Sequence, residues 1–312
     1  MSNSEKPYLS VVVPVYNEQE SIRPLHSRIM DACRNLPFSC EVIFVDDGSS
    51  DKTFIVLEEL HAADPRTKVV RFRKNCGQTH AMAAGFRVAR GEIIVSMDGD
   101  LQNDPADIPR LIEIIENGYD VVCGWRKKRK DKLISRRVPS IIANWLIGKI
   151  TGVPIHDNGC SLKAYRSKVI KRVSLYSEMH RFIPAMSTLV DAKIAEIEVK
   201  HHARKFGKSK YGISRAWRVF TDLFMIKMIT GFATKPGLWF SLLSVPPIML
   251  GVGCIAVPLF VPATLLNLST AGLLLFSLGG HLIVMGVLGE VALGTGDYHP
   301  DVGIGCRVVR LS

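Results

Sequence analysis

Two patterns of hydrophobic residues divide this chain. Over residues 1 to about 200, short runs rich in β-branched residues alternate with segments whose apolar positions have helical spacing. The runs that predict strands are LSVVVPV, CEVIFVDD, KVVRF, EIIVSMD and DVVCG. The helical segments begin near Glu18, Asp51, Gly77 and Pro105. This alternation predicts an α/β fold, with a mostly parallel sheet that helices cover on both faces.

A second pattern begins at Gly237, beyond which the chain is strongly apolar and almost uncharged. Two segments, Gly237–Val261 and about Leu268–Leu293, reach the roughly 20 apolar residues that a membrane-spanning helix needs. A pair of buried helices in a soluble protein is the alternative. So long a run without charge is hard to place in a soluble fold, and the pattern therefore predicts two transmembrane helices.

The second apolar segment carries Gly272, Gly279 and Gly286 at intervals of seven residues. Small residues on one face let transmembrane helices approach closely. We expect this face to pack within the chain or between chains, and we expect a homo-oligomer held through the transmembrane helices. Pro246 and Pro247 are expected to kink the first segment.

The charge lies almost entirely ahead of the apolar tail. The 38 basic and 26 acidic residues before Gly237 give a net charge of +12, whereas the rest of the chain carries −1. A basic region beside apolar helices favours anionic partners such as phosphates or acidic lipid headgroups. Basic residues just before the first span indicate that this side is cytoplasmic. We expect a multi-pass protein of the cell inner (plasma) membrane, with the α/β domain and both termini in the cytoplasm.

These patterns divide the chain into four regions. They are a cytoplasmic α/β domain over 1–212, an amphipathic juxtamembrane helix over 213–235, two transmembrane helices over 236–294 and a cytoplasmic tail over 295–312. The juxtamembrane helix is predicted because Trp217, Phe220 and Leu223 alternate with basic residues at helical spacing. Such a helix lies on the membrane surface, although packing of part of it on the α/β domain is the alternative.

Polar residues gather where the predicted strands end: YNE at 16–18, DDGS at 46–49 and DGD at 98–100. Ligands of parallel sheets bind at the carboxyl ends of the strands, so these residues are candidates for one site. The sequence has no GxGxxG after its first strand and no GxxxxGK[ST]. It therefore argues against a dinucleotide oxidoreductase and against a P-loop nucleotidase.

The DxDxQ pattern predicts a metal site. If the backbone stays extended past Met97, then Asp98, Asp100 and Gln102 lie on one side of it. Hard oxygen ligands suit Mg²⁺ or Mn²⁺, which proteins usually share with substrate phosphates. We predict these three residues as the metal ligands, and Asp104 as the cap of the next helix.

The VDDGSSD segment is expected to serve two purposes. Ser49, Ser50 or Asp51 can cap the helix that follows. Capping does not explain two adjacent aspartates, and Asp46 or Asp47 can accept a hydrogen bond from a nucleobase or a ribose.

The motifs PVYNE, VDDGSSD, MDGDLQ, GWR, DNGCSLKAYR and RKFGKSKY, in this order, resemble those of family 2 glycosyltransferases with the GT-A fold. Over nearly its whole length the chain is similar to polyprenyl-phosphate glycosyltransferases, which include dolichyl-phosphate mannose synthases. Bacterial enzymes that load sugars onto undecaprenyl phosphate are the most similar. The resemblance implies a Rossmann-like GT-A domain and a membrane-bound inverting enzyme. Such an enzyme moves a sugar from a UDP- or GDP-linked donor to a polyprenyl phosphate, for envelope glycan or lipid modification.

The resemblance also implies roles for single residues. Those that match the nucleotide-sugar-binding positions of the family are Pro14, Tyr16, Glu18, Val45, Asp47, Asp98, Gly99, Asp100, Arg126, Arg204 and Lys210. Val45 and Asp47 match contacts to the base, Arg126 matches a contact to the donor phosphates, and Arg204 with Lys210 matches a basic pair that closes over the diphosphate. Asp157 matches an acceptor-side carboxylate that orients the sugar or removes a proton, with a simple loop turn as the alternative. Arg126 and Asp157 are the expected catalytic residues.

Two departures from the family pattern bear on the substrate. Gly99 stands where the family usually has Ala, and we expect the loss of one methyl group to be tolerated. The segment DNGCSLKAYR differs from the dolichyl-type pattern and is similar to that of the aminoarabinose-transferring bacterial branch. The donor sugar therefore stays open.

Three other functions have less support. A processive polysaccharide synthase shares the core but carries a QxxRW motif, which this sequence lacks, and more membrane spans. A non-catalytic membrane subunit that binds nucleotide-sugar would not need Asp98, Asp100, Arg204 and Lys210. The basic run at 126–137 suits a solvated loop or a site for anionic headgroups. No nucleic-acid-binding motif accompanies it, so we expect no nucleic-acid partner.

Overall fold

The computed structural model describes residues 6–34, 36–127, 144, 147–149, 152–173, 175, 179–203, 235–257, 265–295 and 308–311. The chain divides into two units, Met1–Asp222 with Asp301–Ser312, and Leu223–Pro300. The predicted basic pair, Arg204 and Lys210, lies outside the described residues, as do nearly all of the juxtamembrane segment and most of the basic run at 126–137.

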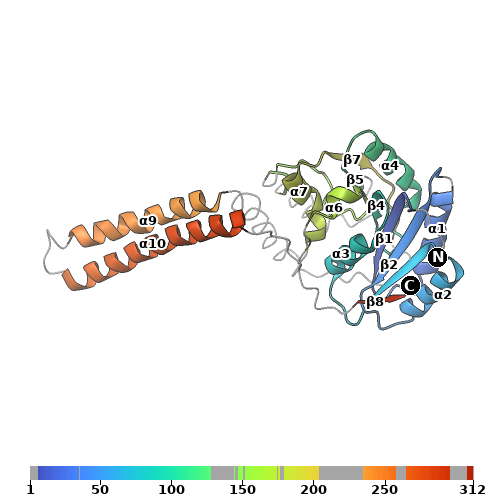
Figure 1. The fold of residues 1–312 in the computed structure, drawn as a ribbon, viewed down its shortest axis with the longest axis horizontal. Helices are drawn as coiled ribbons and strands as arrows, with labels where there is room; N and C mark the ends of the chain where they lie inside the picture. The colour runs from blue at the N-terminus through green and yellow to red at the C-terminus, as the bar shows by residue number, and fades with distance from the viewer. Residues whose placement is uncertain are drawn as a thin grey trace. The chain divides into compact units, whose positions relative to one another are not determined.

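An eight-stranded sheet forms the centre of the first unit (Figure 1). The strand order is β7-β5-β6-β4-β1-β2-β3-β8. The strands are β1 (Leu9–Val15), β2 (Cys40–Asp46), β3 (Thr67–Phe72), β4 (Ile93–Ser96), β5 (Val121–Trp125), β6 (Lys163–Arg166), β7 (Ile194–Glu198) and β8 (Val308–Leu311). Strand β6 is antiparallel to β4 and β5, and β8 is antiparallel to β3. The pairs β1–β2, β1–β4, β2–β3 and β5–β7 are parallel, so the predicted mostly parallel sheet is confirmed.

Helices cover both faces of this sheet. They are α1 (Ile22–Arg34), α2 (Thr53–Ala63), α3 (Gln78–Val88), η1 (Pro105–Asp107), α4 (Ile108–Glu116), α6 (Ser167–Ile170), η3 (Met179–Arg181), α7 (Ile183–Ser187) and η4 (Thr188–Val190). Val11 and Val13 of β1 belong to one core with residues of α1, α2 and α4. Val12, between them, faces Gly85 of α3 on the other side. A strand buried on both faces is apolar without alternation, which explains the run LSVVVPV.

The elements differ from the prediction at several places. Helix α1 begins at Ile22 and not near Glu18, and it follows a turn in which the amides of Ser21 and Ile22 both donate to the Glu18 carbonyl. Strands β6 and β7 were not predicted. Strand β8 lies in the segment expected to be a tail without a strand.

The second unit contains two long helices, α9 (Pro236–Ala256) and α10 (Leu265–Thr295), drawn in orange to red in Figure 1. The helices Pro236–Ala256 and Asn267–Ala292 are long and apolar enough to cross a membrane. Two helices of membrane-spanning length are therefore confirmed. Helix α9 is one helix through Pro246 and Pro247, and the expected kink stays a prediction.

Gly272, Gly279 and Gly286, which recur every seven residues in α10, face α9. A Cβ atom on Gly272 would lie 2.8 Å from the carbonyl oxygen of Gly251, and one on Gly286 would lie 2.9 Å from the Cβ of Phe240. A Cβ on Gly279 would overlap Ile248. This glycine face is therefore used for packing within the chain. The expected homo-oligomer stays a prediction, and it would need another face.

Candidate active site

The ends of β1 and β2 are joined by hydrogen bonds into one framework. The Asn17 amide donates to Ser49 Oγ at 2.9 Å, and the Ser50 amide donates to Asn17 Oδ1 at 2.8 Å. Asn17 has a left-handed φ of 53°, a conformation that Asn adopts more readily than most residues. Of the three predicted caps, Asp51 accepts the Thr53 amide at 2.9 Å. The PVYNE and VDDGSSD motifs thus build one side of the candidate site together.

The two aspartates of VDDGSSD have different surroundings. Both oxygens of buried Asp47 accept backbone amides, from Cys76 at 2.7 Å and from Gly77 at 2.9 Å. Burial raises the pKa of Asp47. Asp46 is fully buried, and its Oδ1 accepts the Ser49 amide at 2.9 Å. Within the described residues, Asp46 Oδ2 has no hydrogen-bond partner. Asp47 therefore holds the turn at 76–77, while Asp46 keeps an acceptor for a ligand.

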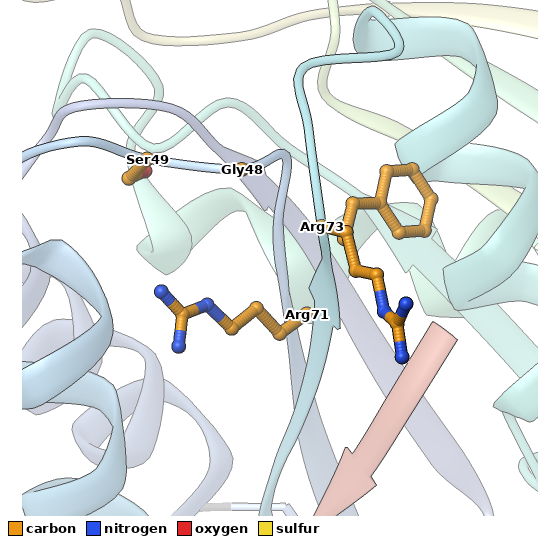
Figure 2. Close-up of a pocket in the computed structure, with 5 residues that line it drawn as sticks. Gly48, Ser49, Arg71 and Arg73 are labelled. Atoms are coloured by element: carbon orange, nitrogen blue, oxygen red, sulfur yellow. The ribbon is translucent and has the colours of Figure 1, made fainter. Parts of the chain in front are cut away.

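A cavity of about 270 Å³ lies at the ends of β2 and β3. Its lining residues are Gly48, Ser49, Arg71, Phe72 and Arg73 (Figure 2). Arg71 Nε lies 3.8 Å from Asp46 Oδ2, and the Arg71 guanidinium lies 3.9 Å from the centre of the Phe54 ring. Among the described residues, those predicted to bind the nucleotide-sugar do not line this cavity. Arg71 was not predicted, although an arginine within the run KVVRF was a signal for it.

Pro14 and Val45 are two of the residues predicted to bind the nucleoside. They lie opposite each other on the neighbouring strands β1 and β2. The Val45 side chain is fully buried toward Gly85 of α3. The expected contact between Val45 and a base stays a prediction, and the burial of the side chain favours the backbone as the group that would make it. Tyr16 and Glu18 are half-buried at the end of β1, and their binding roles stay predictions.

The DGD segment forms a turn. Strand β4 ends at Ser96, and Leu101 has a left-handed φ of 62°. The expected extended backbone past Met97 is therefore wrong, and it no longer supports Gln102 as a ligand. The backbone amide of Gln102 instead donates to Asp100 Oδ1 at 3.1 Å. Asp98 and Asp100 still lie close enough to interact electrostatically. Burial raises the pKa of Asp98 most, and the negative charge of Asp100 raises it further.

Gln78 adds a contact that the sequence did not predict. Its side-chain amide donates to Asp98 Oδ1 at 2.7 Å. Gln78 is the first residue of α3 and directly follows the turn that Asp47 holds. This turn therefore connects the VDDGSSD side of the site to the DGD side.

The acidic residues of the DGD turn fit a divalent metal that is shared with a substrate. Among the described residues, no three or more His, Cys, Asp or Glu side chains gather into a metal site. The protein thus offers two carboxylates rather than a complete ligand shell. Mg²⁺ in particular is commonly bound by one or two carboxylates together with substrate phosphates. The repulsion that raises the pKa of Asp98 is also the interaction that a cation would relieve.

Gly99 lies between these two carboxylates. A Cβ atom on Gly99 would lie 2.7 Å from Val15 Cγ1. The Val15 side chain therefore occupies the space that the usual alanine of the family would need. This supports the expectation that glycine is tolerated here.

Arg126 and Asp157 form a buried ion pair. Arg126 Nε donates to Asp157 Oδ2 at 2.7 Å, and Arg126 Nη2 donates to Asp157 Oδ1 at 2.9 Å. The exposed fractions of the two side chains are 12% and 3%. Burial opposes the charge of Arg126, but the hydrogen bonds to Asp157 and its charge raise the pKa of the guanidinium overall. The sequence predicted both residues but not their pairing, in which Asp157 orients Arg126.

The chain beyond β7 lies against the DGD turn. His201 forms a β-bridge with Asn103, and the His202 amide donates to the Gln102 carbonyl at 2.9 Å. His202 Nε2 lies 3.0 Å from Asp104 Oδ2. The other oxygen of Asp104 accepts the Ala106 amide, which confirms the predicted cap. These contacts bring His201 and His202, which shortly precede the RKFGKSK segment in the sequence, beside Gln102 of the predicted metal site.

Residues 10–174 of the chain match the family model for "Glycosyl transferase family 2". This chain belongs to glycosyl transferase family 2. It is 46% identical, over 80% of its length and 73% of the relative, to the dodecaprenyl-phosphate galacturonate synthase of Rhizobium johnstonii. It is 37% identical, over 91% of its length and 88% of the relative, to an undecaprenyl-phosphate 4-deoxy-4-formamido-L-arabinose transferase of Edwardsiella ictaluri.

The fold of this glycosyltransferase also occurs in solved structures. Glucosyl-3-phosphoglycerate synthase from Mycobacterium tuberculosis, in complex with Mn²⁺, UDP and phosphoglyceric acid, superimposes with a TM-score of 0.55 at 18% identity. The match covers 71% of this chain and 78% of that one. It confirms the predicted GT-A architecture of the α/β domain.

Proposed function

We propose that this glycosyltransferase moves a sugar from a nucleotide-sugar to a polyprenyl phosphate at a membrane. The relatives named above support this substrate class. The observation that carries the proposal is structural. One chain combines paired carboxylates and a fixed arginine at the carboxyl edge of its sheet with two helices of membrane-spanning length.

The reaction needs charge stabilisation more than it needs a base. An oxygen of the acceptor phosphate attacks the anomeric carbon, the bond from this carbon to the diphosphate oxygen breaks, and the nucleoside diphosphate leaves. A phosphate monoester has a second pKa near about 6, so the acceptor is largely dianionic at neutral pH. Asp157 is paired with Arg126 and is therefore assigned to orientation rather than to proton removal. Direct attack inverts the anomeric centre.

The remaining charges in the site act on the diphosphate. Asp98 and Asp100 would hold Mg²⁺ or Mn²⁺, with Gln102 as the predicted third ligand, and the ion would supply electrophilic stabilisation of the leaving group. The Mn²⁺ and UDP of the similar solved structure support a divalent ion and a uridine nucleotide. Within the described residues, Asp157 fixes Arg126 through Nε and Nη2, and we assign Nη1 to a phosphate oxygen. Arg204 and Lys210 are the predicted basic pair that closes over the same group.

The proposed topology has two spans with the catalytic domain and both termini in the cytoplasm, in the cell inner membrane. The pairing of β8 with β3 supports it, because the chain then returns to the catalytic domain after α10. Such a return requires an even number of membrane crossings. A reporter fused after Ser312 should be active only if it functions in the cytoplasm, and a positive periplasm-specific reporter would contradict the topology.

We further propose galacturonate as the donor sugar, because the galacturonate-transferring relative is 46% identical while the formamido-arabinose-transferring relative is 37% identical. The second sugar is the alternative, supported by the DNGCSLKAYR segment. A homo-oligomer through a face of the helices other than the glycine face remains part of the proposal.

Purified protein in detergent should be incubated with undecaprenyl phosphate, Mg²⁺ and labelled UDP-galacturonate or the UDP-linked formamido-arabinose. The expected product is a lipid-soluble sugar phosphate, formed by the wild-type protein and about a hundredfold more slowly by the Asp100→Asn variant. Long glycan chains as the product would instead favour a polysaccharide synthase. Nucleotide binding without any transfer would favour a non-catalytic subunit.

A further inference from the structure

A single carboxylate on β7 holds the loop that carries Asp157. Glu196 Oε1 accepts the backbone amides of His156 at 3.0 Å and of Asp157 at 3.1 Å. Glu196 Oε2 lies 2.7 Å from His156 Nδ1. The Glu196 side chain has an exposed fraction of 14%, whereas the His156 side chain that it contacts is 64% exposed. They fix the backbone of the very residue that binds Arg126.

The same loop is held from the side of Arg126. The His156 ring stacks on Trp125 with a centroid distance of 4.5 Å and an interplanar angle of 21°. Trp125 is the last residue of β5 and directly precedes Arg126. Strand β5 pairs with β7, where Cys123 is in register with Glu196. Arg126 and Asp157 lie 31 residues apart in the sequence. Strand β7 therefore helps to position both of them, Arg126 through β5 and Asp157 through Glu196.

We propose that Glu196 is a positioning residue for the Arg126–Asp157 pair. A glutamine at this position keeps one neutral and weaker acceptor oxygen, and it replaces the other oxygen, which faces the His156 amide and ring, by a donor. The loop can then shift. A shift of Asp157 releases the guanidinium that it orients. This proposal rests on the proposed function, since the arginine is assigned there to the leaving diphosphate. Misplacement of a catalytic group by about 1 Å can lower a rate by about a hundredfold.

Strand β7 also provides a matched control. Glu198 lies two residues further along the same strand and contacts Lys127 at 3.6 Å, with exposed fractions of 46% and 56%. An exposed ion pair of this kind contributes little to stability. Glu198→Gln removes the same charge from the same strand without touching the loop of Asp157.

The first measurement is hydrogen–deuterium exchange of the full-length protein in detergent. Glu196→Gln is expected to speed exchange at the amides of His156 and Asp157, whereas Glu198→Gln is not. If Glu196→Gln is poorly folded, Glu196→Asp keeps the charge but shortens the reach, and it should give the same local change. Unchanged exchange at these two amides in the folded variant would overturn the proposal.

The second measurement is a double-mutant cycle on sugar transfer to undecaprenyl phosphate. Glu196→Gln is expected to lower kcat about tenfold or more, with the KM for the lipid nearly unchanged, and Glu198→Gln to stay within about twofold. In the Asp157→Asn background, Glu196→Gln should cost almost nothing further, because it acts through Asp157. Additive losses, or a full rate in Glu196→Gln, would refute the positioning role. Absence of transfer by the wild-type protein would instead defeat the proposed function, while the exchange measurement would still test the contacts of Glu196.

Discussion

Buried carboxylates lie at both edges of the sheet, and they differ in how completely they are hydrogen-bonded. At the amino edge, Glu41 Oε1 accepts Ser10 Oγ at 2.6 Å and the Arg90 amide at 2.7 Å. Its Oε2 accepts Lys68 Nζ at 2.5 Å. Burial opposes the charge of Glu41, but the hydrogen bonds from Lys68, Ser10 and Arg90 lower its pKa overall. This carboxylate is satisfied by the protein itself.

At the carboxyl edge, Asp98 and Asp46 are compensated less completely: Gln78 donates to Asp98 Oδ1, and Arg71 Nε lies 3.8 Å from Asp46 Oδ2. Asp98 has its pKa raised by burial and by Asp100, and the described residues give Asp46 Oδ2 no hydrogen bond. A buried carboxylate with too few hydrogen bonds destabilises the protein when no ligand is bound. Such carboxylates are typical of functional sites, where a bound ligand supplies the missing interaction. The contrast teaches that the partners of a carboxylate, rather than its burial, separate a structural role from a binding role.

The largest effect is expected for Asp100→Asn, which removes one negative charge from the binding edge. Sugar transfer should fall about a hundredfold, corresponding to the roughly 3 kcal/mol of a lost charge-assisted interaction. The midpoint of thermal unfolding should not fall, because the repulsion with Asp98 is also relieved. Transfer by the wild-type protein should stop in EDTA and return with Mg²⁺ or Mn²⁺. Full activity in EDTA would show that these carboxylates do not hold a metal.

Gln78→Met tests the hydrogen bond that the Gln78 side chain donates to Asp98 at the carboxyl edge of the sheet. Methionine keeps the approximate length of the side chain but removes the amide that donates to Asp98 Oδ1. Outer hydrogen-bond partners of metal ligands commonly change metal affinity by about tenfold or more. We expect Mn²⁺ binding, measured by electron paramagnetic resonance, to weaken about tenfold. Gln19→Met is the control, because Gln19 accepts the Lys52 amide and does not contact Asp98; equal losses in both variants would contradict the assignment.

Glu41→Gln should show the opposite pattern, with a loss of stability and no loss of activity in the folded protein. Glutamine turns a donor toward Lys68, and we expect the free energy of unfolding to fall by about 2 kcal/mol at pH 7. The pKa of Glu41 is lowered by folding. Its stabilisation is therefore complete above the unfolded value of about 4.3, and it is lost as the pH falls through the folded value.

The difference in unfolding midpoint between wild type and Glu41→Gln should consequently shrink as the pH falls from 6 to below 4. A difference that grows in acid would mean that the folded pKa of Glu41 is raised rather than lowered. A loss of transfer by folded Glu41→Gln would break the contrast between the two edges.

The sequence predicted β1 to β4 to within about two residues. Strands β1, β2 and β4 are buried on both faces and are therefore largely apolar, while β3 keeps apolar Val69, Val70 and Phe72 beside half-buried Lys68 and Arg71. Strand β6 was not predicted because its four residues include the charged Lys163 and Arg166. Lys163 is nevertheless buried, since its ammonium donates to the carbonyls of Asn158 and Cys160. Strand β7, IAEIE, is half-buried, and its alternation of apolar and acidic residues was a usable signal.

For the candidate site, residue types at the strand ends were predictable, while their partners were not. The turn at Leu101 depends on a left-handed backbone conformation. Such a conformation is usually predicted from a glycine, and this position holds a leucine. The pairing of Arg126 with Asp157 closes a segment of 31 residues. No local pattern encodes such a contact, and the same holds for Glu196, which contacts the loop of Asp157 from another strand.

The smallest effect is expected for Gly99→Ala, which tests the packing beneath the binding edge rather than its charge. The new methyl group would lie 2.7 Å from Val15 Cγ1. Overpacking of a filled core costs about 1 kcal/mol at the low end of its range. We expect the free energy of unfolding to fall by this amount, with transfer within about threefold of wild type. Val15→Ala should open a small void when made alone, and it should offset Gly99→Ala when the two are combined, because one change makes the space that the other fills. A double variant whose unfolding free energy is the plain sum of the single losses would show that Val15 does not fill this space.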